Sequence, residues 1–211
     1  MPEMTVARRN LAVVCAIWGV ALVASGIAPY ERLTWFMEVL PVLVAAPVLL
    51  TTHQRLPLTT LAYILIAIHG LILIYGGAYT YARVPAGFWV QDLLGFSRNP
   101  YDRLGHLAQG FVPAIVAREL LLRVFRIEAR RILFFLVACV ALAISAFYEL
   151  IEWWAALLIG AEADEFLATQ GDVWDTQWDM FLALTGAVAA QLLLGRWHDR
   201  QIVQLEKARA P

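Results

Sequence analysis

The chain contains six apolar segments, each close to the roughly 20 residues that a helix needs to cross a lipid bilayer. Hydrophobic residues make up 61% of the 211 residues, and charged residues make up only 16%. Soluble globular domains are about 45–50% apolar and about 25% charged, so this composition is typical of a polytopic membrane protein. We predict an all-α fold, a membrane helical bundle in one domain, with spans at about residues 10–28, 34–51, 58–78, 103–124, 131–159 and 175–194.

The distribution of basic residues predicts the orientation of these spans. Eleven arginines and lysines lie at one set of span ends, whereas the other set has Arg32, Arg83, Arg98 and Arg103. Since basic residues accumulate on the cytoplasmic side, we expect both termini in the cytoplasm. The basic stretch at residues 123–131 is short and juxtamembrane, so we expect it to meet membrane lipids and no nucleic acid.

The longest external connection, residues 79–102, contains two apolar runs, PAGFWV at 85–90 and DLLGF at 92–96. We expect it to form an interfacial or re-entrant segment that covers the outer mouth of the bundle. The sixth span is borderline, because its uncharged core, Met180–Leu194, is too short alone. It reaches spanning length only if Asp175 and Asp179 lie in its outer turns.

Ionisable side chains gather at the outer ends of the last three spans. Charged groups are costly at the hydrocarbon boundary and usually serve a function there. Helical spacing supports a shared site, since residues three or four positions apart lie on one face of a helix. The six candidates, two at the edge of each span, are Asp102, His106, Glu149, Glu152, Asp175 and Asp179.

Three interpretations of these six residues are open. Carboxylate oxygens with one imidazole can bind a divalent cation such as Mg²⁺, Mn²⁺ or Zn²⁺, and all six are then candidate metal ligands. Closely spaced carboxylates can instead share protons in a relay. In a structural role, Asp102, Asp172 and Asp175 would cap helix N-termini, and Arg98 or Arg103 would neutralise a glutamate.

Four other ionisable residues receive structural interpretations. His69, near the middle of the third span, is expected to make an interhelical hydrogen bond. Glu119 is expected to pair with the arginine before it or with the one four positions after it. His53 and His198 flank the cytoplasmic ends of their spans and are expected to be solvated.

Three motifs carry a resemblance to a known family. They are NPYDRLGHLAQGFVP at residues 99–113, YELIEW at 148–153 and TQGDVWDTQWDM at 169–180. Together they resemble the YjdF-like family of bacterial inner-membrane proteins, and the resemblance covers essentially the whole chain. It implies a multi-pass location in the bacterial inner (cytoplasmic) membrane and supplies no activity.

A looser similarity is to the VanZ-like membrane proteins. That group has an acidic–basic pair followed shortly by His, and Asp102, Arg103 and His106 follow the same order. A Glu-x-x-Gln-type pair comes next, then Asp followed by a polar residue and Gly. Glu152 and Asp179 stand where that group usually has amides, which makes this site more acidic. The similarity implies only an envelope or lipid-linked substrate.

These residues predict a cation-dependent site on the extracytoplasmic side that acts on a lipid-linked or envelope substrate. A bound metal would polarise a phosphoryl oxygen or lower the pKa of its water. Glu149 or Glu152 would be the catalytic general base, and His106 would be a ligand or a general acid. The alternatives are a proton- or cation-coupled transporter and a structural or partner-binding membrane protein.

Overall fold

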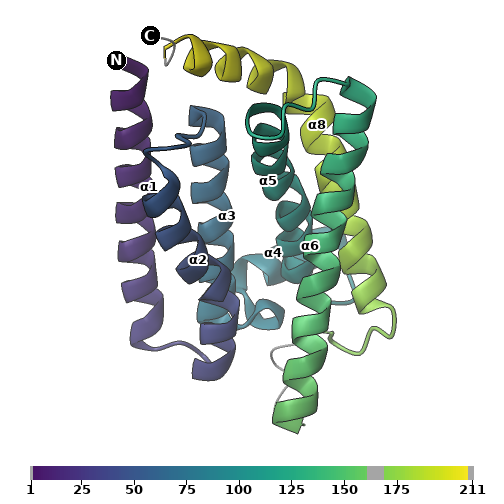
Figure 1. The fold of residues 1–211 in the computed structure, drawn as a ribbon. Coiled ribbons are helices and arrows are strands. Elements are labelled where there is room, and N and C mark those ends of the chain that lie inside the picture. Colours follow the sequence, from purple (N-terminus) through teal and green to yellow (C-terminus); the bar gives the residue numbers. More distant parts are fainter. Residues whose placement is uncertain (1, 161–168, 209–211) are drawn as a thin grey trace.

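The computed structural model describes residues 2–160 and 169–208, and this part of the chain contains helices and no strand. The long helices run side by side, and the chain begins and finishes at the same end of the bundle (Figure 1). The all-α prediction is confirmed. In chain order the elements are α1 (Pro2–Ile27), α2 (Arg32–Thr52), α3 (Thr60–Tyr79), the 3₁₀ turn η1 (Tyr81–Arg83), α4 (Pro85–Leu94), α5 (Tyr101–Arg123), α6 (Arg130–Ile159) and α8 (Asp175–Lys207).

Five of the described helices are long and apolar enough to cross a membrane: α1, α2, α3, α6 and α8. The predicted fourth span, α5, is 23 residues long but carries more charge, including Arg118, Glu119 and Arg123. These three side chains are buried, because α5 lies against α3, α6 and α8. Protein rather than lipid therefore surrounds the polar groups of α5, which is how ionisable residues are usually accommodated in a bundle. That α5 crosses the bilayer stays a prediction.

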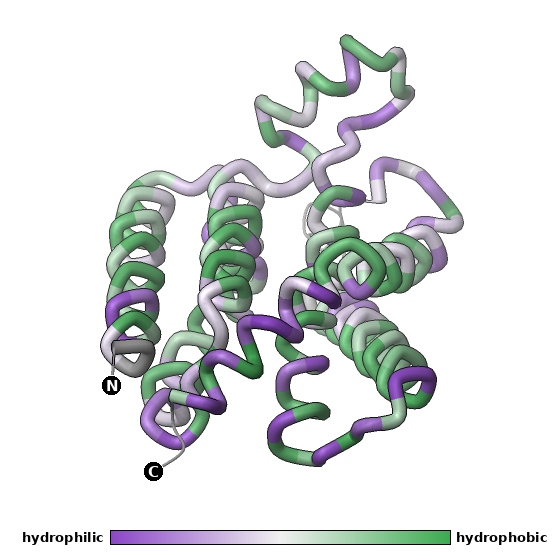
Figure 2. Tube along the Cα trace, turned by 90° about the horizontal axis from the view of Figure 1, so that it is seen from above, coloured by the Kyte–Doolittle hydropathy of each residue, from purple (hydrophilic) through white to green (hydrophobic). Residues whose placement is uncertain are grey.

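The outward faces of the long helices are apolar (Figure 2). On α1, Val20 and Val23 are 73% and 70% exposed, and on α8 Leu192 and Leu193 are 71% and 73% exposed. A continuous apolar surface of this kind is unfavourable in water and suits hydrocarbon. The bundle therefore presents the surface of a multi-pass membrane protein.

The N-terminal helices pack through one large side chain inserted beside a glycine. Trp18 of α1 is 3% exposed and donates its indole N–H to the Ala67 carbonyl of α3 at 3.2 Å. A Cβ on Gly70 would lie 2.2 Å from the same indole, so only glycine leaves room for it. This contact fixes α1 against α3, and α3 in turn packs on α5.

Helices α5 and α8 lie so close together that their backbones touch. A Cβ on Gly110 would lie 1.7 Å from the carbonyl oxygen of Ala183, and one on Gly186 would lie 2.2 Å from that of Leu107. Small residues allow two helix backbones to touch in this way within a membrane. The pairing places the starts of α5 and α8 side by side, at the end of the bundle away from the chain termini (Figure 1). This is the end predicted to face outward, and the helix ends that lie there are called the outer ends.

The last helix extends beyond the predicted end of its span at Leu194 and continues to Lys207. Its final segment turns across the end of the bundle where the chain begins (Figure 1). Figure 2 shows this segment as a largely hydrophilic stretch over the apolar helices. Its buried residues recur at helical spacing, at Gly195, His198, Ile202 and Leu205, so one face packs on the bundle.

Replacing Gly110 with alanine should lower the thermal stability of the detergent-purified protein. The added methyl group would collide with the backbone of α8, which cannot yield without separating the two helices. Overpacking of this kind typically costs about 1–3 kcal/mol. Gly19→Ala in α1 is the matched control, because its Cβ would meet nothing within 4 Å. Equal melting temperatures for the two variants would contradict this account of the α5–α8 contact.

Candidate functional site

His106 lies at the centre of a buried acidic cluster between the outer ends of α5, α6 and α8. Its Nε2 is 3.5 Å from Asp102 Oδ1 and 3.8 Å from Asp179 Oδ2. All three residues are buried, at 5% exposure or less. Asp102 and His106 are one turn apart on α5, and the close contact with α8 brings Asp179 to them.

The other imidazole nitrogen of His106 faces a second pair of acids. Its Nδ1 is 2.9 Å from Gln109 Oε1 and 3.8 Å from Glu149 Oε1. An amide oxygen only accepts, so this hydrogen bond requires a proton on Nδ1, and Nε2 faces the aspartates. Glu149 is 8% exposed, and Glu152, one turn later on α6, is half-buried.

Two triads of possible metal ligands share His106. One consists of Asp102, His106 and Asp179, and the other of His106, Glu149 and Glu152. Within each triad the ligand atoms all lie within 4.8 Å of one another. Asp102 Oδ2, Glu149 Oε1 and Asp179 Oδ1 are buried and make no hydrogen bond. Buried acceptors without a hydrogen-bond donor are uncommon in folded proteins.

Asp175, the sixth predicted ligand, is in neither triad. Arg98 donates from Nη1 to Asp175 Oδ1 at 2.6 Å and lies 3.5 Å from Asp172 and from Asp102. Arg103 pairs with Asp172 at 3.0 Å. The two arginines therefore pair with aspartates, and the prediction that one of them neutralises a glutamate is wrong for the described residues. Arg98 closes the edge of the cluster with positive charge.

Asp102 and Asp175 lie in the first turns of α5 and α8, yet neither caps its helix. The N-cap positions are Pro100 and Trp174, without a side-chain cap in either case. The predicted capping role is therefore wrong for these two aspartates, which point into the cluster instead. Asp172 does accept the backbone N–H of Trp174 at 3.0 Å, immediately before α8.

The segment that carries Arg98 is held by the loop before α8. The Gln170 side chain accepts from the Asn99 N–H and donates to the Asn99 carbonyl, both at 3.0 Å. The Asn99 side chain accepts from the Tyr101 N–H at 3.0 Å, and Pro100 sets the start of α5. Arg98 is thus positioned by two chain segments that sequence alone does not bring together.

Glu38 is an acidic residue near the cluster that the sequence interpretation missed. It lies in α2, is 5% exposed, and accepts a hydrogen bond from the Tyr148 hydroxyl at 3.4 Å. The Tyr148 ring packs edge-on against the His106 imidazole, with ring centroids 6.4 Å apart. Glu38 also interacts electrostatically with Asp102 and His106. Glu38 could have been identified from the sequence, because a lone carboxylate inside an apolar span is a functional candidate by default.

A family described as "Predicted membrane protein (DUF2238)" matches residues 10–200 of the chain. The chain belongs to this family. It is also 59% identical over 181 residues to the inner membrane protein YjdF of Escherichia coli (strain K12), a match that covers 86% of this chain and 87% of that protein. With its several apolar helices, the protein is a multi-pass inner membrane protein. No solved structure matches the chain.

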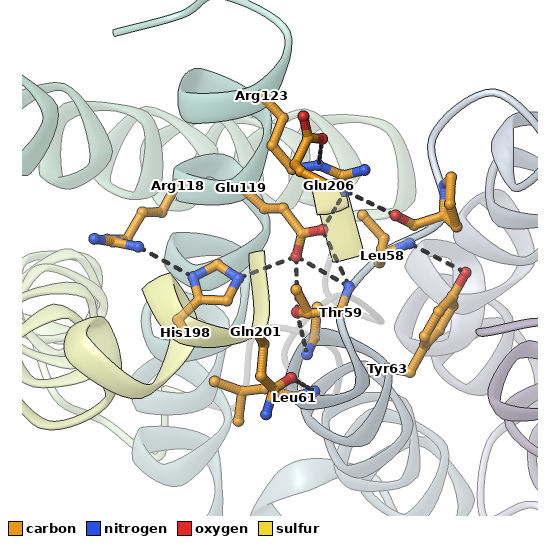
Figure 3. Close-up of polar contacts among 12 residues, drawn as sticks. Leu58, Thr59, Leu61, Tyr63, Arg118, Glu119, Arg123, His198, Gln201 and Glu206 are labelled. Atoms are coloured by element: carbon orange, nitrogen blue, oxygen red, sulfur yellow. Dashed lines mark hydrogen bonds and ion pairs between the residues drawn. The ribbon is translucent and has the colours of Figure 1, made fainter. Parts of the chain in front are cut away.

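A second buried network lies at the opposite end of α5 (Figure 3). Its centre is Glu119, which is 0% exposed. The carboxylate accepts from the Thr59 N–H at 3.0 Å, from the Thr59 hydroxyl at 2.8 Å and from Arg123 Nη1 at 2.5 Å. His198 Nε2 donates to it at 3.0 Å. The expected pairing of Glu119 with a neighbouring arginine is confirmed for Arg123.

The expectation that His198 is solvated is wrong. Its side chain is 0% exposed, because the end of α8 turns back over the bundle and carries it inward. Its Nδ1 accepts from Arg118 Nη1 at 3.3 Å, and Arg118 also donates to Asp199 at 2.6 Å. His53, likewise expected to be solvated, is half-buried with Nδ1 2.9 Å from the Tyr63 hydroxyl.

The Glu119 network differs from the His106 cluster in its charge balance. Each Glu119 oxygen has hydrogen-bond donors. Arg123, beside it, has further acceptors, since it donates to the Pro57 carbonyl at 2.7 Å and to Glu206 at 2.9 Å. A buried charge network with its acceptors satisfied stabilises one arrangement of helices. The Glu119 network therefore locks α3, α5 and the end of α8 together.

Replacing Glu119 with alanine should destabilise the protein strongly. The substitution leaves buried donors of Thr59, Arg123 and His198 without their acceptor, and breaking a buried ion pair costs about 3–5 kcal/mol. The measurement is the melting temperature in detergent. Glu128→Ala is the control, since Glu128 is exposed between α5 and α6. A melting temperature for Glu119→Ala that equals that of the control would show that the network does not hold the helices.

Proposed function

We propose that the protein binds a divalent cation at the outer ends of α5, α6 and α8 and uses it in chemistry on a lipid-linked or envelope substrate. The observation that carries the proposal is the triad of Asp102, His106 and Asp179, whose buried ligand atoms lie within 4.8 Å of one another. Carboxylates with one imidazole suit Mn²⁺ or Zn²⁺, and Mg²⁺ when oxygen ligands dominate.

The charge balance of the cluster supports a cation. Arg98 is the arginine that contacts these acids directly within the described residues, and it pairs with both Asp175 and Asp102. The carboxylates of Asp102, Asp179, Glu149 and Glu152 crowd around a single imidazole. Like charges at this spacing in a buried site need protons or a cation to offset their repulsion. Metal coordination would satisfy the buried oxygens of Asp179 and Glu149 that make no hydrogen bond.

The two sides of His106 suggest a division of roles. On the Nε2 side, Asp102 and Asp179 would hold the metal together with the imidazole. On the Nδ1 side, Glu149 and half-buried Glu152 would accept the proton of an attacking water, as a general base does. The cation would supply Lewis-acid polarisation of the substrate oxygen.

The surroundings of the cluster favour an amphipathic substrate. An open apolar depression of about 320 Å³ lies on α8, lined by Trp174, Gln177, Trp178 and Phe181. It adjoins the turn that carries Asp175 and Asp179. The Arg103 guanidinium lies over the Trp178 ring, 5.3 Å from its centroid, at the rim. A lipid-linked substrate would place its apolar chain against these aromatics and its polar head near the acidic residues.

The helix packing between the cluster and the middle of the bundle favours a site that is open to one side of the membrane over a coupled transporter. One turn inward of His106, Gly110 meets the backbone of α8, so the two helices leave little room for a polar path between them. His69 lies near the middle of α3. Its Nε2 is buried without a hydrogen-bond partner, so the expected interhelical hydrogen bond is absent at that nitrogen.

Purified protein should bind Mn²⁺ or Zn²⁺ stoichiometrically, and Asp179→Asn should weaken binding. Loss of a ligand should raise the dissociation constant by more than the roughly 10–100-fold that changes in the residues around metal ligands cost. The measurement is isothermal titration calorimetry in detergent, together with metal analysis before and after chelation.

Asp92→Asn is the matched control, because Asp92 is exposed and lies on α4 rather than in the cluster. The control should bind the metal as the wild type does. Absence of stoichiometric metal from the wild type, combined with no heat of binding, would refute the cation site.

Arg98→Gln should make the stability of the protein depend more strongly on divalent cations. The substitution removes the positive charge nearest to Asp175 and Asp102, so repulsion among the carboxylates rises when no metal is bound. The melting temperature should fall in chelator and recover when Mn²⁺ is added, by more than the wild type recovers. An equal loss with and without Mn²⁺ would mean that Arg98 has a purely structural role.

A further inference from the structure

Helix α4 (Pro85–Leu94) is a short helix that joins the outer end of α3 to the start of α5. It lies crosswise to the long helices of the bundle (Figure 1). Ten residues of α-helix are about 15 Å long, about half of the hydrocarbon thickness, so α4 cannot cross a bilayer. Its position between the outer ends of two bundle helices places it near the outer membrane surface.

One face of α4 lies against the protein and carries Gly87 and Gln91, which are one turn apart. A Cβ on Gly87 would lie 1.8 Å from Asn99 Oδ1, so the helix presses directly on that side chain. Asn99 is 0% exposed and donates to the Val84 carbonyl at 3.0 Å. The Gln91 Oε1 atom is also buried. The start of α4 is therefore anchored rather than loose.

A second face of α4 is a stripe of large apolar side chains that the protein leaves uncovered. Trp89 and Leu93, one turn apart, are 75% and 82% exposed. Val90 and Leu94, the adjacent pair, are 41% and 59% exposed. The stripe is wide enough to form the apolar face of an amphipathic helix. A ten-residue helix with this face uncovered would be marginal in water.

Asp92 is the charged residue of α4, and it is exposed. On a helical wheel, Asp92 falls between Phe88, which is 44% exposed, and Trp89, at one edge of the apolar stripe. The helix thus has one side against the bundle and a broad apolar side, with the charge of Asp92 at the edge of that apolar side. An interfacial helix needs an apolar side of this kind, and tryptophan is enriched where such helices meet the headgroups.

We propose that α4 is an in-plane membrane anchor whose apolar stripe lies among the acyl chains of the outer leaflet. The bilayer is the partner because the stripe exposes large apolar side chains of the same kind as those that the long helices expose. The anchor also sets the depth of the acidic cluster. Gly95, in the left-handed conformation at φ 66°, ends α4, and the chain reaches Arg98 and α5 within a few residues.

The depth of single nitroxide labels tests the proposal in reconstituted vesicles of phosphatidylethanolamine and phosphatidylglycerol. Cysteines are introduced one at a time as Leu93→Cys and Asp92→Cys in a background with Cys15→Ala and Cys139→Ala. Collision with oxygen, which concentrates in lipid, is compared with collision with a water-soluble nickel chelate. The Leu93 label should lie about 5–10 Å below the headgroup boundary, as for interfacial helices, and the Asp92 label should face water.

Two further labels calibrate the measurement. Val20→Cys on the exposed face of α1 is the lipid reference, and Arg126→Cys, 71% exposed by its side chain, is the water reference. If Leu93→Cys fails to fold, Trp89→Cys reports on the same stripe. Nickel access to the stripe equal to that at Arg126 would overturn the proposal in favour of a solvent-facing helix or a protein partner. Deep lipid access at both Leu93 and Asp92 would overturn it in favour of a re-entrant segment.

Discussion

The close contact of α5 with α8 is the constraint on which the remaining polar architecture depends. Gly110 and Gly186 let the two backbones touch, and the side chains on either side of this contact are brought together as a result. On one side of the contact these are Asp102, His106 and Asp179, and on the other they include Glu119 and His198. Lipid offers no hydrophobic drive for helices to associate, so small residues that permit close packing decide which helices pair.

The two ends of α5 carry the same kinds of side chain but differ in charge balance. At the end that carries Glu119, Arg118, Arg123 and Arg130 pair with Glu119, Asp199 and Glu206, and the Glu119 carboxylate has donors on both oxygens. At the end that carries His106, several carboxylates share one imidazole, and buried oxygens lack donors. Satisfied polar groups hold a fold together, whereas unsatisfied ones in a buried site call for a ligand or a proton. This contrast is the reason for proposing a function at the His106 end.

The polar character of α5 also explains how the bundle is built. Its charged residues make α5 less apolar than α1, α2, α3 and α6, and α3, α6 and α8 pack on it. The outer rim is completed by segments between helices, since Gln170 fixes Asn99 and Arg98 closes the cluster against Asp175. Side chains from α2 also reach this end, where Glu38 meets Tyr148. The site thus draws on side chains between Glu38 and Asp179.

The sequence by itself determined the helical membrane fold and the convergence of most of the outer cluster. Both depend on local quantities: the length of apolar runs, the helical period that aligns Asp102 with His106, and the depth at which each run ends. Only the tertiary structure decided that Asp175 pairs with Arg98, that Glu38 approaches from α2, and that His198 is buried beside Glu119. These contacts join residues tens of positions apart, and they depend on how helices pair and where α8 turns. Neither property is encoded in the period or composition of a single segment.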